Sequence, residues 1–323
     1  MRKFVGLIGV VGACVLLLGA CQKSEGAVST AGTVEKSELR FIVVPKVVHP
    51  WFDEVNKGAQ AEAALLSEQL GRKVTVDFRA PTAADVAEQN TILSQAAATR
   101  PDGIAFDPLD YDGNKAVVDE IRAQGIPVII FDAPVPEGSG LTAVGNNFWE
   151  QAQMASEYLV NLLGGKGRVA IMQGVPTAPN HRERYEAHKA TFAKYPGITV
   201  VAEGIAADDI QTAQQQAAAI IAANPNIDGF VCCDAAAPIG IANAIKEAGK
   251  AGQIKLVGLE DLPEMIAIVK DGTMTAASCT IPRVQGSMSV LMMWQASLGV
   301  QIPKFVDTGI AFLTPENVDN WGK

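Results

Sequence analysis

Short apolar runs alternate with longer amphipathic stretches along this chain, and that alternation constrains the fold more than any other feature. Between the first two runs, apolar side chains recur every three or four residues on one helical face, at Phe52, Val55, Ala59, Ala63, Leu66 and Leu70. The apolar runs predict strands at 39–44, 74–78, 103–106, 127–131, 143–145, 168–172, 199–203, 229–233, 255–258 and 275–280. Strands that are apolar on both faces are typical of parallel sheets covered by helices. The repeating pattern therefore predicts a doubly wound α/β fold.

The first twenty-one residues have the pattern of an export signal. Arg2 and Lys3 precede an apolar run at 4–18, which is too short to span a bilayer comfortably. Residues 18–21 resemble the bacterial lipobox, which implies that Cys21 is diacylated and becomes the mature N-terminus. An ordinary secretory signal with an incidental cysteine is the alternative. Residues 1–20 are thus predicted to be a signal peptide, and the small, polar segment 21–37 a flexible linker.

The mature chain is expected to be extracytoplasmic, in the periplasm or on the outer face of the cytoplasmic membrane. No second apolar run reaches transmembrane length, so a lipid anchor alone would hold it there. Without Arg2 and Lys3, 24 of the 26 basic residues remain against 35 acidic ones, a net charge of −11. This charge, with no basic run, excludes nucleic acid as a partner.

About 285 residues follow the linker, a length that favours two lobes over one core. Only Cys232, Cys233 and Cys279 remain in this body, so it has no disulfide framework. Buried thiols are the favoured interpretation, and a bond from one of the first two to Cys279 stays open.

Polar side chains follow many of the predicted strands, at the edge where open parallel sheets bind ligands. The candidates at these ends are Lys46, His49, Asp107, Asp132, Asn180, Arg182, Asp234 and Glu260. A single carboxylate at such a position is most simply the N-cap of the next helix, but so many polar ends together favour a binding site. Trp51 and Phe52 add two adjacent rings, on which the C–H face of a sugar could stack. Core packing is the alternative for Phe52, and the favoured one for Phe148 and Trp149.

Several of these motifs occur together in the order and spacing of one known family. They include the Pro-Trp-Phe segment at 50–52, Asp107-Pro108, the run 126–132, the segment 145–147, the Arg-Glu-Arg segment at 182–184, and Ile281-Pro282. Residues 39–313 resemble the periplasmic sugar-binding proteins of ABC importers, related to the ribose-binding protein and to LacI-type regulator cores. The resemblance implies a periplasmic binding protein of type I, with two parallel-sheet lobes joined by three crossovers. It places one lobe at 38–145 plus 281–307 and the other at 146–280 plus 308–323, with ligand-driven closure of the cleft between them.

The resemblance also implies roles for individual residues. Trp51 and Phe52 match the stacking aromatics, Asp132 a binding carboxylate, and Arg182 the ligand arginine. His49 replaces a frequent Asn, Glu260 a frequent Asp, and Thr280 a common Gln, while Asp234 stands at a frequent Asn or Asp. One departure concerns Ala133, because many sugar binders have Arg or Ser there. Pro45-Lys46 and Asp234-Ala235 are similar to the branch that binds AI-2 or rhamnose, although Asn180 and His181 depart from it.

The resemblance therefore implies a monomer without cofactor or metal that passes a sugar, polyol or AI-2-like ligand to an ABC permease. A receptor partner for chemotaxis or a sensor kinase is the second hypothesis. A glycosidase using Asp132 and Glu260 is the third, although the sequence holds no nucleophile elbow, P-loop or His-Glu-x-x-His motif. His181 and His188 are spaced as on one helix, and a solvated face is favoured over a metal site.

Overall fold

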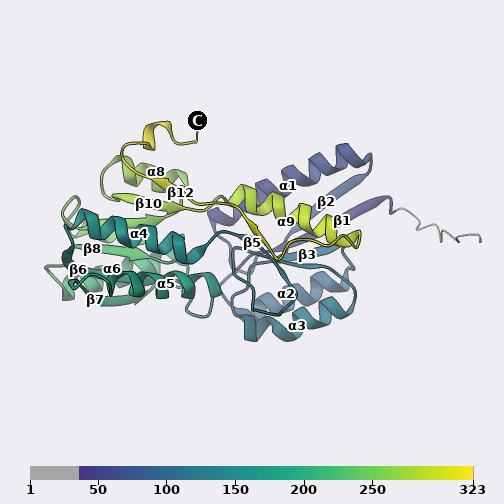
Figure 1. Cartoon of the computed structure of the whole chain (residues 1–323), viewed down its shortest axis with the longest axis horizontal. Helices are drawn as coiled ribbons and strands as arrows, with labels where there is room; N and C mark the ends of the chain where they lie inside the picture. Colours follow the sequence, from purple (N-terminus) through teal and green to yellow (C-terminus); the bar gives the residue numbers. More distant parts are fainter. Residues whose placement is uncertain (1–35, 323) are drawn as a thin grey trace, which may run out of the picture. The chain divides into compact units, whose positions relative to one another are not determined.

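The computed structural model describes residues 36–322, and the predicted signal peptide and nearly all of the predicted linker lie outside this range. Two six-stranded sheets organise the described chain (Figure 1). In spatial order, sheet A contains β11 (Phe305–Asp307), β5 (Thr142–Gly145), β4 (Val128–Phe131), β3 (Gly103–Phe106), β1 (Glu38–Val44) and β2 (Lys73–Phe78). Sheet B contains β12 (Ala311–Leu313), β10 (Ala276–Cys279), β9 (Lys255–Leu259), β8 (Gly229–Cys232), β6 (Lys166–Gln173) and β7 (Gly197–Ile205).

All pairs in sheet A are parallel, and in sheet B only β12 runs antiparallel to its neighbour β10. The doubly wound fold and all ten predicted strands are confirmed. The strands β11 and β12 were not predicted. Each is three residues long and only partly buried at a sheet edge, so neither produces an apolar run in the sequence.

Helices cover both faces of each sheet. The helices are α1 (Pro50–Leu70), α2 (Val86–Ala98), α3 (Tyr111–Ala123), α4 (Phe148–Leu162), α5 (Pro179–Phe192), α6 (Ile210–Ala223), α7 (Ala237–Glu247), α8 (Pro263–Lys270), α9 (Pro282–Ser297) and the 3-10 turn η1 (Val318–Asn320). Figure 1 shows α1 and α9 on one side of sheet A and α2 and α3 on the other. In sheet B, α4 and α5 pack on one face and α6, α7 and α8 on the opposite face.

Successive side chains of a strand lie in two different hydrophobic cores, because alternate residues point to opposite faces of the sheet. In β1, Phe41 and Val43 pack with α1, whereas Ile42 and Val44 pack with α2 and α3. The four side chains are completely buried. Burial on both faces explains why these strands are continuously apolar in the sequence.

The chain passes from one sheet to the other three times: between β5 and α4, between β10 and α9, and between β11 and β12. The thiols of Cys232, Cys233 and Cys279 are buried and free, which answers the question that the sequence left open. Within residues 36–322, no helix combines the length and the apolar character needed to cross a membrane.

Candidate functional site

A cavity of about 20 Å³ lies among side chains that follow the carboxyl ends of strands in both sheets. Its lining residues are Lys46, His49, Trp51, Phe52, Asp132, His181, Arg184, Asp208, Ala235 and Glu260. A cavity of this size holds about one water molecule. Any organic ligand is several times larger, so its binding requires the lining side chains of the two sheets to separate.

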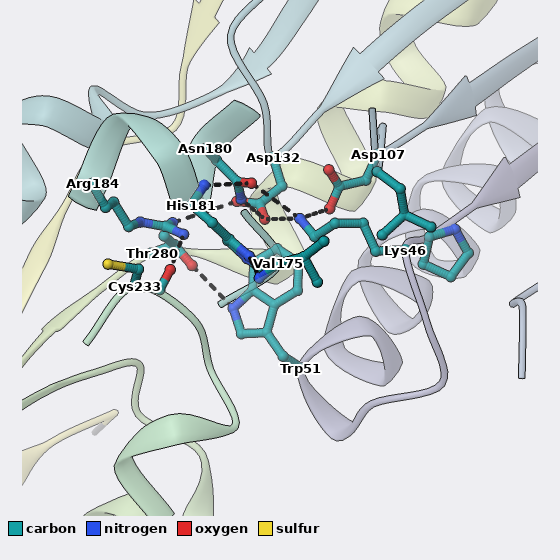
Figure 2. A network of polar contacts seen from close by, with 12 residues as sticks. Lys46, Trp51, Asp107, Asp132, Val175, Asn180, His181, Arg184, Cys233 and Thr280 are labelled. Carbon is teal, nitrogen blue, oxygen red and sulfur yellow. Dashed lines mark hydrogen bonds and ion pairs between the residues drawn. The ribbon is translucent and has the colours of Figure 1, made fainter. Parts of the chain in front are cut away.

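Lys46 lies at the centre of a polar network that joins the two sheets (Figure 2). Its ammonium lies 2.5 Å from Asp107 and 3.3 Å from Asp132, both on sheet A, and donates across the cleft to Asn180 Oδ1 at 3.4 Å. Asn180 in turn donates to Asp132 Oδ2 at 2.8 Å. Burial alone would lower the pKa of Lys46, but Asp107 and Asp132 outweigh it, so the pKa is raised and the ammonium stays charged. Lys46, Asp107 and Asp132 thus each have an oppositely charged partner, which reduces the cost of burying them.

Trp51 bridges the two sheets through its indole. His49 is the N-cap of α1, and its Nδ1 accepts from the backbone N–H of Trp51 at 3.1 Å, which orients the start of the helix. The indole Nε1 donates to Thr280 Oγ1 at 3.1 Å, and Thr280 donates through its hydroxyl and backbone N–H to Glu260 Oε2 at 2.7 and 2.9 Å. Phe52 meets Trp51 edge to face at 5.0 Å. Both rings line the cavity and also pack in the core, so core packing does not remove them from the site.

Arg184, and not Arg182, points into the site. Residues two apart on a helix do not share a face, and α5 turns Arg184 inward while Arg182 is exposed. The Arg184 guanidinium stacks at 4.9 Å over Phe148, donates to Gln151 Oε1 at 2.9 Å and lies 3.8 Å from Asp132 Oδ1. Arg182 instead lines a separate hollow of about 490 Å³. The arginine that lines this cavity is therefore Arg184, two residues after the position that the sequence analysis assigned to the ligand arginine.

Phe148 is buried, as core packing predicted, and supports the Arg184 guanidinium. Trp149 is 39% exposed, so the prediction of core packing is wrong for this residue. His181 and His188 share the inward face of α5 and are buried, so the predicted solvated face is wrong. His181 Nδ1 accepts from the Val175 backbone N–H at 2.9 Å, and the ring lines the cavity. No His, Cys, Asp and Glu cluster able to hold a metal occurs within residues 36–322.

Asp208 is a lining residue that sequence reasoning missed. It follows β7 in a short loop, where Ala207 and Asp208 both have positive φ angles, of 54° and 58°. Asp132 and Glu260 share this backbone state, at 48° and 67°. Non-glycine residues seldom occupy that region, and such strain gathers at functional sites. Asp208 also lies beside a second acid in the sequence, Asp209, which simply caps α6, so no local signal distinguished it.

The strand-end carboxylates differ in what they do. Asp234 does pair with the start of α7, because its Oδ1 accepts from the backbone N–H of the N-cap residue Ala236 and from that of Ala237, the first helical residue. Its Oδ2 is buried and, within the described residues, has no hydrogen-bond partner. The same holds for Asp132 Oδ1 and His49 Nε2. The two carboxylate oxygens are acceptors, whereas His49 Nε2 is a donor, because Nδ1 of this neutral ring accepts from a backbone N–H. Buried polar atoms of this kind are costly unless a ligand or water supplies the missing partner.

Burial controls the protonation of the site. It raises the pKa of Asp234 to about 7, an effect to which Asp208 adds, and it raises the pKa of Glu260 to about 7. Burial also lowers the pKa of His49 and, much more, that of His181, so both imidazoles are neutral at neutral pH. The site thus combines strongly perturbed carboxyl groups with aromatic rings, as binding and active sites do.

Among known proteins, a family model described as "Periplasmic binding protein domain" matches residues 41–300. The D-allose-binding periplasmic protein of Escherichia coli K12 is 28% identical over 265 residues, which cover 79% of this chain and 83% of that relative. A solved ABC transporter solute-binding protein from Burkholderia graminis C4D1M, in complex with D-arabinose, superposes with a TM-score of 0.83 at 26% identity, covering 90% of this chain and 100% of the other. GanP, a glucose-galactose binding protein from Geobacillus stearothermophilus, gives a TM-score of 0.80 at 26% identity over 87% and 99%.

The two parallel-sheet lobes and the buried site between them define a solute-binding protein of type I architecture. The chain belongs to the periplasmic binding protein family. It is therefore a binding protein of the extracytoplasmic compartment and not an enzyme, which overturns the glycosidase hypothesis for Asp132 and Glu260.

Proposed function

We propose that this chain is the substrate-binding lipoprotein of an ABC importer and captures a sugar or sugar-like molecule between its two lobes. The observation that carries the proposal is the convergence of side chains from both sheets on one buried cavity. They include Trp51, Arg184 and Asp132, whose Oδ1 has no hydrogen-bond donor in the described chain. The C–H face of a sugar can stack on the aromatic ring, while its hydroxyls donate to the carboxylates and accept from the guanidinium. This combination suits a polyhydroxylated ligand. Relatives named for allose and ribose binding support the same ligand class.

The proposed binding residues are the predicted ones with two changes. Lys46, His49, Trp51, Phe52, Asp107, Asp132, Asn180, Asp234, Glu260 and Thr280 remain, Arg184 replaces Arg182, and Asp208 is added. We propose the lobe boundaries 38–145 plus 281–307 and 146–280 plus 308–323, which the sheet membership of each strand supports. The three crossovers between the sheets would then act as the hinge that opens the cavity to a ligand.

A screen of pentoses, hexoses, polyols and AI-2 tests this function on the mature protein in detergent. We expect at least one compound to raise the melting temperature by about 5 °C at 100 times its Kd, because binding to the folded state alone stabilises it by about 2.7 kcal/mol. The bound compound should be recovered chemically unchanged. If no compound shifts the melting temperature and calorimetry detects no binding, the proposed function is wrong.

The lipid anchor is part of the same proposal, since Cys21 lies outside the described residues. Changing Cys21→Ser should move the protein from the membrane fraction to the soluble fraction, or leave it unprocessed and heavier, because serine offers no thiol for acylation. Cys14→Ser is the matched control, since Cys14 lies within the apolar run of the signal and should not affect anchoring. Unchanged fractionation and mass of the Cys21→Ser protein would rule out the anchor.

A further inference from the structure

Carboxyl groups outnumber cations at the cavity. Within residues 36–322, five carboxyl groups that line it or contact its lining are each at least nine-tenths buried: Asp107, Asp132, Asp208, Asp234 and Glu260. The two buried cations beside them are Lys46 and Arg184. Both imidazoles of the site are neutral, so they do not correct the imbalance. A buried carboxylate without a partner is costly, and this site has three more carboxyl groups than cations. Burial raises the pKa of Asp234 and of Glu260 to about 7, so the cost is met in part by protonation.

Three of these five carboxyl groups belong to residues with a strained backbone conformation. Asp132, Asp208 and Glu260 are three of only five non-glycine residues with positive φ in the described part of the chain. They come from both sheets, yet all three side chains line the same cavity. Strain shared by three acidic groups at one cavity is difficult to explain by packing, because an amide or a small residue would fill the same space at lower electrostatic cost.

Three acidic oxygens of the site are buried and have no hydrogen-bond donor within residues 36–322. They are Asp107 Oδ1, Asp132 Oδ1 and Asp234 Oδ2. Asp208 lies near Asp234, since its charge adds to the raised pKa of Asp234. The position after Asp132, where the resemblance leads one to expect Arg or Ser, is Ala133, so no further cation follows it. The hydroxyls of a neutral sugar would supply donors but leave the excess charge unchanged.

We propose that the ligand of this cavity carries a protonated amine, as aminosugars and aminopolyols do, and that Asp208 and Asp234 hold the ammonium group. The inference rests on the proposed function and narrows its ligand class. An ammonium offers three donors and one positive charge, so it satisfies the unpaired Asp234 oxygen and reduces the excess of carboxylates together. Trp51 and Arg184 remain available for the rest of the sugar.

A definite pH dependence follows from this arrangement. Glu260 faces Arg184, Asp132, Asp261 and the Thr280 hydroxyl, whereas Asp234 faces Asp208, Arg184 and the N–H groups that begin α7. Each of the two carboxyl groups has a pKa of about 7 in the ligand-free protein. An ammonium held by Asp208 and Asp234 binds the ionised form of Asp234, and its charge also favours the ionised form of Glu260, so its binding releases protons and weakens as the pH falls from 8 to 6. A neutral sugar meets the carboxylates through its hydroxyls alone, so its affinity should depend less on pH.

Calorimetry on the mature protein in detergent with three matched pairs tests the inference. The pairs are 6-amino-6-deoxy-D-glucose with D-glucose, 5-amino-5-deoxy-D-ribose with D-ribose, and 1-amino-1-deoxy-D-glucitol with D-glucitol. In at least one pair we expect the amine to bind about tenfold or more tightly than its parent at pH 8, as a charge-assisted hydrogen bond allows. Its affinity should fall roughly fivefold or more at pH 6. If no amine binds more tightly than its parent, the inference is overturned, while the screen of neutral sugars judges the proposed function separately.

A charge-matched pair of variants locates the ammonium. Asp208→Asn should reduce the ratio of amine to parent affinity by about fivefold or more, because it removes one charge next to the amine. Glu68→Gln removes the same charge from an exposed position on α1, about 25 Å along the helix from Trp51, and should leave the ratio unchanged. An equal loss of amine and parent binding in Asp208→Asn, or an unchanged ratio, would overturn the assignment of Asp208.

Discussion

Replacing Arg184 with Met is expected to weaken sugar binding by about 10- to 150-fold, the effect of losing a charged hydrogen-bond donor. The guanidinium is 3% exposed, rests on the Phe148 ring and lies 3.8 Å from Asp132 Oδ1, so nothing else in the described chain occupies its position at the cavity. Methionine preserves much of the side-chain volume, which limits the loss of packing. The affinity is measured by calorimetry with the tightest compound from the ligand screen.

Arg182→Met is the matched control for this experiment, since it makes the same change two residues away on the same helix. Arg182 is exposed, and its variant should bind within about twofold of the wild type. The two variants thus separate the sequence-based assignment from the structural one. Wild-type affinity in Arg184→Met with a tenfold loss in Arg182→Met would restore the original assignment and contradict the site described above.

The second large effect is expected at the contact between α1 and α9. Gly58 of α1 lies against the backbone of Arg283, where an added Cβ would come within 1.9 Å of a carbonyl oxygen, and Gly286 of α9 meets the Val55 carbonyl oxygen at the same distance. Backbone cannot rotate away as a flexible side chain can. Each Gly→Ala substitution must therefore push the helices apart, and we expect a loss of about 2 kcal/mol or more and a melting temperature lower by roughly 5 °C or more.

Gly113→Ala in α3 is the control for these two variants. There an added Cβ would meet a side-chain methyl of Val86 at 2.8 Å and no backbone atom within that distance, so the higher helix propensity of alanine should offset the contact. Thermal unfolding followed by circular dichroism measures all three proteins. A melting temperature of Gly58→Ala or Gly286→Ala equal to that of the wild type would show that the helices are less closely packed than the structure has them.

Most strands and helices could be predicted from the sequence, because the apolar runs and the helical spacing that mark them lie within short stretches of neighbouring residues. The apolar runs at 39–44 and 103–106 predicted β1 and β3, since strands buried on both faces must be apolar throughout. The spacing from Phe52 to Leu70 predicted α1, whose buried face follows the same period. Edge strands such as β11 lack this signal, because partial exposure removes the need for an apolar run.

The sequence by itself determined that polar and aromatic groups would gather at the strand ends, because parallel strands carry their carboxyl ends to one edge. Only the tertiary structure decided which side of α5 faces the cleft, and hence that Arg184 lies beside Asp132. Apolar and polar residues occur on all sides of this helix, so the sequence does not show which side is buried. The same is true of Asp208, whose loop approaches His49 and Lys46 only because the two lobes close on each other. Contacts between residues more than a hundred positions apart, such as Lys46 with Asn180, depend on lobe geometry that no local pattern encodes.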